Sequence, residues 1–331
     1  MTAKRAFLIV MALLTASNTS VWAQNSLGDL VAQGGYDWFL GTWAATTDNG
    51  EELVVEQKWA LDRHAIVVDI QMGEFKMTGL MFFIPWREEV VQYGADNRGG
   101  TWKGLWRDEY GSAVQRLEHT QASGEVRKAE IVHTKIDNDS MKVAMYGLDD
   151  DGYRNSTPWS TLTYQRRKGA STGKAASAST SGMLGSLLSQ NGYDWILGTW
   201  QGVDDQGRTA QAGYGLTLDG CAGMVNVSMG SFRYQGLVLF VPASEEVLQI
   251  GADNMGGYWK GTWTEDYEGL ANRHEYTRAD GTTEKMEHLY VKVNDGTFKV
   301  KQYAVEASGY RASTPRGEVT FTKSTDEAAS K

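Results

Sequence analysis

The chain has 331 residues, a formal net charge of −9 and a single cysteine, Cys221. An acidic chain repels phosphates, which argues against nucleic acid as a partner, and a lone cysteine excludes an intrachain disulfide. The length suits two domains that each bury a core of ordinary size.

Residues 1–23 have the pattern of a secretory signal peptide. Lys4 and Arg5 precede an apolar run at 7–14, and Val21-Trp22-Ala23 is a small-x-small cleavage site. The apolar run is too short to span a bilayer. The sequence therefore predicts a secreted or periplasmic protein that starts at Gln24 after cleavage and has no stable membrane insertion.

The remaining sequence contains an internal duplication. Residues 36–163 align with residues 193–320 at a constant offset of 157 without a gap, and about 40% of the paired positions are identical. Solenoid repeats are much shorter, about 20–50 residues, so this period indicates a duplicated domain. We predict domains at 24–167 and 183–323, separated by a flexible linker at 168–182 and followed by a polar tail at 324–331.

Each copy is expected to begin with a short amphipathic helix, at 26–33 and at 183–190. Gly34 and Gly192 follow these segments in the place where glycine ends a helix.

The rest of each copy has the pattern of β-strands. Runs of β-branched and aromatic residues alternate with turn signals, which gives nine or ten strands per copy, spaced about every 10–14 residues. No βαβ alternation appears, so the fold class is all-β, as an antiparallel barrel or sandwich. In the first copy the clearest such runs are 53–59, 65–72, 76–84, 90–95 and 101–107.

A Gly-Thr-Trp element follows the predicted helix in both copies, as Gly41-Thr42-Trp43 and Gly198-Thr199-Trp200. This element resembles the start of the lipocalin and fatty-acid-binding protein superfamily, the calycins. The longer Phe/Ile-Leu-Gly-Thr-Trp run looks most like a group of bacterial secreted lipocalin-like domains of unknown function. The resemblance covers about 128 residues of each copy. It implies two tandem up-and-down barrels, each closed at one end by its Gly-x-Trp residues: Gly41, Trp43, Gly198 and Trp200.

Four paired tryptophans are candidate ligand-binding residues: Trp102, Trp106, Trp259 and Trp263. Side chains alternate along a strand, so the two tryptophans of each copy share a face with the glycine between them. One interpretation is barrel core. The other is an aromatic wall for an apolar ligand or a sugar ring.

A second set of candidates recurs as Arg116 with Glu118 and Arg273 with Glu275. These residues form either a solvated outer face, with a weak ion pair, or an interior face where an arginine must neutralise an anion. Fatty-acid-binding barrels hold carboxylates with interior arginines, so the resemblance adds weight to the interior alternative, and both alternatives stay open.

Histidine usage argues against a metal or haem, and no cofactor is expected. The five histidines are His64, His119, His133, His274 and His288, and none has a histidine at its paired position. His119 could meet His133 on neighbouring strands, as His274 could meet His288, but no further ligands stand at metal spacing.

The favoured hypothesis is a binding protein for a small hydrophobic or amphipathic molecule, with one site in each barrel. An enzyme of the isomerase, lyase or hydrolase type is the alternative, with Glu118, Glu275, Tyr146 and Tyr303 as candidate groups inside the barrel. A third possibility is a pair of filled barrels that serve as a structural or adhesion module. The second copy has Leu216, Ala243 and Arg316 where the first has Trp59, Trp86 and Trp159, which would give two sites different selectivity.

Overall fold

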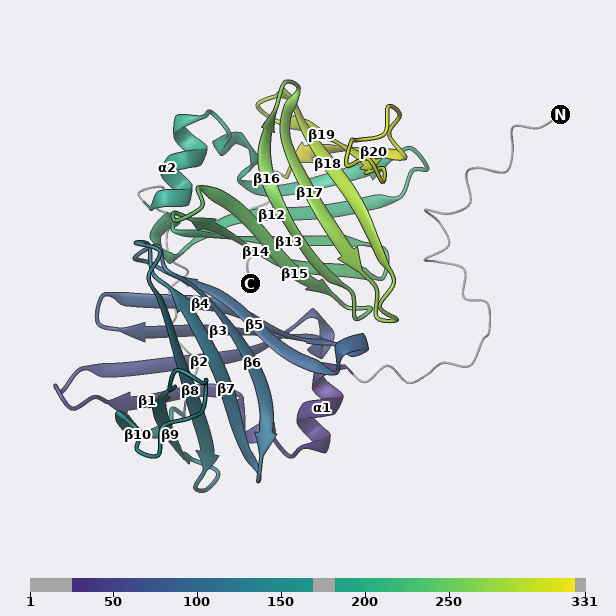
Figure 1. Ribbon diagram of the computed structural model, residues 1–331. Coiled ribbons are helices and arrows are strands. Elements are labelled where there is room, and N and C mark those ends of the chain that lie inside the picture. The colour runs from purple at the N-terminus through teal and green to yellow at the C-terminus, as the bar shows by residue number, and fades with distance from the viewer. Residues whose placement is uncertain (1–25, 169–181, 325–331) are drawn as a thin grey trace.

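The computed structural model describes residues 26–168 and 182–324 (Figure 1). These ranges form two closed antiparallel barrels of ten strands each, and each barrel is preceded by one short α-helix. The predicted fold class is confirmed. The predicted signal peptide, the interior of the predicted linker and most of the tail lie outside the described residues.

In each barrel every strand pairs with its neighbours in sequence, and the first strand pairs with the last to close the sheet. Helix α1 spans Leu27–Gln33 and helix α2 spans Met183–Gln190, in agreement with the prediction to within one residue. The strands of barrel 1 are β1 (Gly41–Thr46), β2 (Glu52–Ala60), β3 (Ala65–Met72), β4 (Phe75–Ile84), β5 (Glu89–Asp96), β6 (Thr101–Glu109), β7 (Ser112–Thr120), β8 (Val126–Lys135), β9 (Ser140–Gly147) and β10 (Ser160–Arg166). Those of barrel 2 are β11 (Gly198–Asp204), β12 (Thr209–Thr217), β13 (Ala222–Met229), β14 (Phe232–Val241), β15 (Glu246–Asp253), β16 (Tyr258–Asp266), β17 (Gly269–Thr277), β18 (Thr283–Asn294), β19 (Thr297–Ala304) and β20 (Gly317–Lys323).

A buried tryptophan fastens each barrel to the turn that precedes it. The Trp43 indole N–H donates to the Phe39 carbonyl at 3.0 Å, and the Trp200 indole N–H donates to the Ile196 carbonyl at 2.8 Å. Both rings are fully buried. Arg166, at the end of β10, lies over Trp43 with its guanidinium carbon 4.2 Å from the ring centre, so the first and last strands meet at this ring.

Gly41 adopts a φ of +108°, and a Cβ at this position would lie 2.7 Å from the Arg166 Nη1 atom. Glycine therefore suits both the backbone conformation and the close approach of the arginine. Arg166 uses that space to donate to the carbonyls of Leu40 and Trp38 at 2.7 and 2.6 Å.

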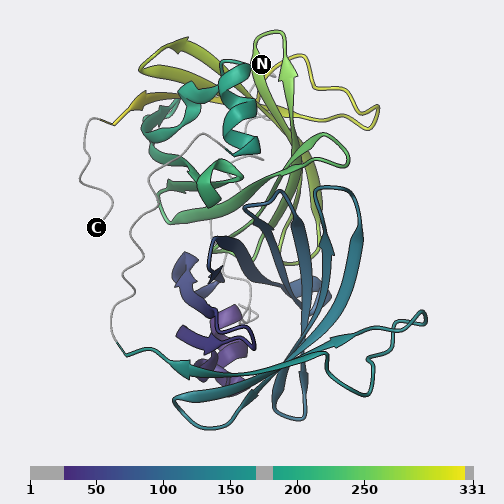
Figure 2. The same ribbon diagram turned by 90° about the vertical axis from the view of Figure 1, so that its left-hand side faces the viewer.

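The two barrels pack against each other through the same patch of outer surface. Strands β3–β5 of barrel 1 meet β13–β15 of barrel 2, and barrel 2 lies directly above barrel 1 in both views (Figures 1 and 2). Many of the buried residues come in pairs at the repeat offset: Ala65/Ala222, Leu80/Leu237, Phe82/Leu239 and Ala95/Ala252. The interface is thus self-complementary, as in a twofold-symmetric dimer.

Polar and aromatic contacts at the edges of this interface differ between the copies. Lys76 Nζ lies 2.8 Å from Asp219 Oδ2, and the ring of Phe82 stacks on Tyr258 with centroids 5.6 Å apart.

Both α-helices of the described ranges have fewer than ten residues, and no candidate membrane-spanning helix is found there.

Candidate ligand cavities of the second barrel

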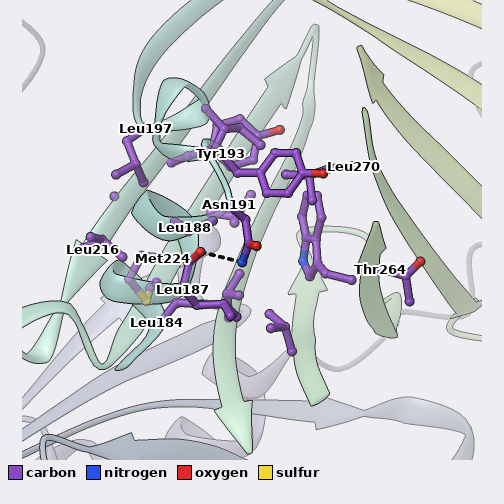
Figure 3. A pocket seen from close by; sticks show the side chains of 18 of the residues that line it. Leu184, Leu187, Leu188, Asn191, Tyr193, Leu197, Leu216, Met224, Thr264 and Leu270 are labelled. Atoms are coloured by element: carbon purple, nitrogen blue, oxygen red, sulfur yellow. Dashed lines mark hydrogen bonds between the residues drawn. The ribbon is translucent and has the colours of Figure 1, made fainter. Parts of the chain in front are cut away.

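Barrel 2 contains a cavity of about 190 Å³ between helix α2 and the adjacent end of the barrel (Figure 3). Three leucines of α2 form one wall: Leu184, Leu187 and Leu188. The opposite wall comes from strands of the barrel and includes Val225, Val238, Trp263 and Leu270. We call this space the outer cavity. Its lining is mostly apolar, which favours apolar ligand surface over water.

A small polar group borders the outer cavity. The Tyr193 hydroxyl donates to Glu265 Oε1 at 2.7 Å, and the Asn191 side-chain amide donates to the Leu187 carbonyl at 2.9 Å. Burial and the Glu265 carboxylate raise the pKa of Tyr193 to about 12, so this phenol is protonated at neutral pH. The rim can therefore offer hydrogen bonds to a polar group of a ligand.

A second cavity of about 90 Å³ lies deeper inside barrel 2. We call it the inner chamber. Its lining mixes aromatic rings with uncharged polar groups: Phe232, Tyr234, Gln249, Trp259, Asn272, His274, His288 and Tyr290. A space of this size holds several water molecules or a group of a few heavy atoms, since one water needs about 10–15 Å³.

Two polar atoms of the inner chamber are buried without a hydrogen-bond partner among the described residues. They are Nε2 of His274 and Nδ2 of Asn272. The other ring nitrogen of His274, Nδ1, lies 3.0 Å from Asn272 Oδ1. An amide oxygen can only accept, so His274 carries its proton on Nδ1 and presents Nε2 as a bare acceptor.

Both histidines of the inner chamber are neutral at neutral pH. Burial lowers the pKa of His288 to about 4, and burial together with the proximity of His288 holds the pKa of His274 well below its usual value. Their rings lie 4.7 Å apart, as predicted for neighbouring strands. The corresponding prediction for His119 and His133 is wrong, because the register of β7 and β8 places His133 opposite Ala113.

Three aromatic rings lie along the boundary where the two cavities adjoin. Tyr290 lines the inner chamber, whereas Tyr214 and Trp263 line the outer cavity. The ring of Tyr290 lies 4.9 Å from that of Trp263 and 6.2 Å from that of Tyr214. The Trp263 indole N–H donates to Gln249 Oε1 at 2.8 Å, which ties this boundary to the polar side of the inner chamber.

The lining of the outer cavity differs between the copies. At four of the lining positions barrel 1 carries a larger side chain: Phe39 for Ile196, Trp59 for Leu216, Ile66 for Gly223 and Met81 for Val238. All four belong to the packed core of barrel 1 or contact it directly. Barrel 1 also has Leu117 and Ile131 where barrel 2 has His274 and His288.

The four candidate tryptophans all face barrel interiors. Trp259 lines the inner chamber and Trp263 the outer cavity. In barrel 1, Trp102 packs so closely on Gly94 that a Cβ there would lie 2.3 Å from the indole. The Trp106 indole N–H donates to Gln92 Oε1 at 2.9 Å. The barrel 1 pair is therefore core, whereas the barrel 2 pair borders open space.

The arginine and glutamate candidates do not face the interior, which corrects the interior alternative. Arg273 lies between the inward Asn272 and His274 on β17, so it points outward, where it bonds Glu287 at 2.6 Å. In barrel 1, Arg116 donates to the Gly152 carbonyl at 2.5 Å on the outer face. Glu118 and Glu275 project from the same outer faces of β7 and β17.

Tyr146 and Tyr303 also lie outside the barrels. Arg154 lies over the ring of Tyr146 at 5.2 Å, and Arg311 lies over that of Tyr303 at 4.9 Å. Both arginines come from the loop before the last strand, which folds back over the outer face. The groups named for an enzyme in the barrel interior are therefore not assembled there.

The sequence pattern predicts Trp259 and Trp263 but not the other residues that line the two cavities. The leucines of α2 have only the pattern of an amphipathic helix, and nothing in the sequence distinguishes Gln249 or Asn272 from other polar strand residues. One signal was present: His274 and His288 replace apolar residues of the first copy. Within the described ranges, no three His, Cys, Asp or Glu side chains are grouped as a metal site requires.

Comparison with known proteins gives little to add to this geometry. No protein-family model matches the sequence, and no curated protein matches it. One solved structure, a protein of unknown function of the DUF3598 family from Nostoc punctiforme, aligns with 86% of this chain and 95% of its own at 11% identity and a TM-score of 0.20. A likeness this low carries no argument about function.

Proposed function

We propose that the protein binds one small apolar or amphipathic molecule per chain, in the outer cavity of barrel 2. The observation that carries this proposal is an apolar space of about 190 Å³ in one barrel, at positions where the other barrel has larger, packed side chains. The same fold closes with the larger side chains in barrel 1, so it does not need the smaller ones of barrel 2 for stability. The proposal replaces one site in each barrel by a single site in barrel 2.

Fold and location are part of the same proposal. Ten-stranded closure, the helix before each barrel and the buried Gly-x-Trp tryptophans support a place among lipocalin-like barrels. The signal-peptide pattern at residues 1–23 supports secretion or a periplasmic location. In this setting the protein would carry or sequester its ligand outside the cytoplasm.

The size of the outer cavity limits the ligand. An apolar protein cavity of about 150 Å³ holds a benzene ring, so one ring or a short branched chain fits here. Burying about 200 Å² of apolar ligand surface contributes about 5 kcal/mol. This corresponds to a Kd of about 0.2 mM for a ring-sized probe, and a larger ligand with rim contacts should bind more tightly.

The test is a ¹⁹F NMR titration of the full chain with fluorobenzene. A double variant, Gly223→Ile with Val238→Met, gives the outer cavity the side chains that barrel 1 uses. A Cβ at Gly223 meets its neighbours at 3.4 Å, so the site accepts a side chain without a backbone clash. The wild type should bind with a submillimolar Kd and the double variant at least tenfold more weakly.

The matched control is Val203→Ile, which adds one methylene at a site on β11 that is 52% exposed, and it should bind as the wild type does. Equal binding by the double variant and the wild type, or no binding by the wild type, would refute the proposal. Native mass spectrometry of the purified protein should show a retained molecule at one copy per chain. Two copies per chain would restore the model of one site in each barrel.

A further inference from the structure

We infer that the inner chamber of barrel 2 recognises an uncharged group that both donates and accepts a hydrogen bond, such as a hydroxyl or a carboxamide. This inference deepens the proposed function, because it describes the polar end of a ligand whose apolar part occupies the outer cavity. The two cavities adjoin at Val225, which lines both.

The first argument is the pair of unsatisfied atoms. Nε2 of His274 is a buried acceptor and Nδ2 of Asn272 is a buried donor, and neither has a partner among the described residues. Native proteins pair nearly all such buried atoms with protein, water or ligand. A group that accepts from the amide and donates to the imidazole completes both bonds, and a hydroxyl or a carboxamide can do both.

The second argument is charge. Of the described residues that line the inner chamber, Lys260 is the one with a formal charge. Lys260 lies between the inward-facing Trp259 and Gly261, so its side chain is exposed on the outer face of β16. A bound carboxylate would therefore lose its hydration without gaining a cation, which is very unfavourable.

A cationic group would also lack a counterion. The carboxylate of Asp253 lies behind Trp259 and already accepts hydrogen bonds from the Met255 and Gly257 amides and the Trp259 indole, at 2.8, 2.9 and 3.1 Å. Both histidines are neutral at neutral pH, so they add no charge of either sign.

The third argument comes from the duplication. Barrel 1 builds the same ten-stranded fold with Leu117, Ile131 and Met77 where barrel 2 has His274, His288 and Tyr234. These three polar side chains of the inner chamber are therefore not required by the fold. A hydrogen bond from a ligand would offset the cost of burying the unbonded nitrogen of His274.

The experiment uses four probes that are small enough to bind in the inner chamber alone: n-propanol, propanamide, propanoate and propylammonium. The full chain, with ¹⁵N-labelled histidine, is titrated with each probe at pH 7.5 while the imidazole ¹⁵N resonances are recorded. Propanol and propanamide should shift the His274 Nε2 resonance, and their Kd values should be at least tenfold lower than those of the two ions. Equal effects from all four probes would overturn the inference, and so would no effect, which would mean that the chamber holds only water.

Two variants give further tests. His274→Leu with His288→Ile copies barrel 1, so it should still bind fluorobenzene in the outer cavity but lose the preference of propanol and propanamide over the ions, read from one-dimensional ligand NMR. Asn272→Gln, which copies Gln115 of barrel 1, moves the amide donor by one methylene and should weaken propanamide binding at least fivefold. Unchanged preferences in both variants would overturn the inference. If the wild type does not bind fluorobenzene, the proposed site in the outer cavity is wrong. That failure is therefore distinguishable from a failure of the inference about the inner chamber.

Discussion

Buried histidine side chains should make the stability of each barrel depend on pH. In barrel 1 the ring of His133 packs against Phe39 and Trp106, and both of its nitrogens are buried without a partner among the described residues. Burial lowers the pKa of His133 to about 4, from a usual value of 6.5. Between these two pH values His133 is protonated in the unfolded chain and neutral in the folded chain. The free energy of unfolding therefore falls as the pH drops through this window, by at most about 3 kcal/mol per histidine.

Urea unfolding at pH 7.5 and pH 4.5 measures this loss. His133→Leu removes one contribution, so the variant should lose less stability than the wild type between the two pH values, by about 1–3 kcal/mol. His64→Leu is the control, since His64 is at the surface turn before β3 and should leave the difference unchanged. If His133→Leu and the wild type lose the same stability, His133 is not held neutral by the fold.

At this same scale, the sequence predicts which residues share a face but not which face is inside. On β7 one face carries Gln115 and Leu117, and the other carries Arg116 and Glu118. Both faces contain polar residues, so alternation alone leaves the choice open. The tryptophan faces were easier to place, because large aromatic rings are buried wherever a core can take them.

At the scale of the element, the loop before the last strand acts as a strap over the outer face of each barrel. Arg311 comes from this loop in barrel 2, and its Nη1 lies 2.9 Å from Glu287 Oε1, while Arg273 holds the other oxygen of the same carboxylate. The side chain of Glu287 is only 4% exposed. Barrel 1 repeats the arrangement with Arg154 and Glu130. The recurrence of arginine at 116 and 273 therefore has a structural cause.

Glu287→Gln should destabilise the strap, because it removes the charge that two arginines share. Both arginines keep access to water, so we expect a loss of about 1–3 kcal/mol in the free energy of unfolding rather than the larger cost of a fully buried pair. Glu275→Gln, on the exposed face of the preceding strand, should change it by less than about 0.5 kcal/mol. Urea denaturation at pH 7.5 compares the two, and equal effects would show that the strap does not depend on this carboxylate.

At the scale of the molecule, the two barrels should unfold as one cooperative unit. Leu237 is fully buried in the interface between the barrels. Leu237→Asp puts an unpaired charge there, which should cost about 3–5 kcal/mol and separate the calorimetric transition into two. Val293→Asp, at a position on β18 that is 53% exposed, should keep one transition. A single unchanged transition in Leu237→Asp would mean that the barrels do not stabilise each other.

The duplication, strand class and helices could be predicted from the sequence because they depend on local pattern and on a gapless offset. The contact between the barrels could not, because Leu80, Phe82 and their partners form an apolar outer face on strands whose inner face is also apolar. Such strands have no period that separates core from interface. The change from Trp59 to Leu216 is visible in the sequence, but the cavity is not, because its lining combines residues from α2 and from several strands that only the fold brings together.

The self-complementary patch has a consequence for how the two copies can diverge. In a dimer of separate, identical chains, every substitution appears on both sides of the symmetry axis, so a change that opens one pocket opens both. Here the partner surface is covalently attached, and its effective concentration is set by the chain rather than by the abundance of the protein. Pairing therefore survives while the copies specialise. One barrel can keep a tightly packed core that supports the interface, while substitutions in the other can open a cavity without breaking the pair.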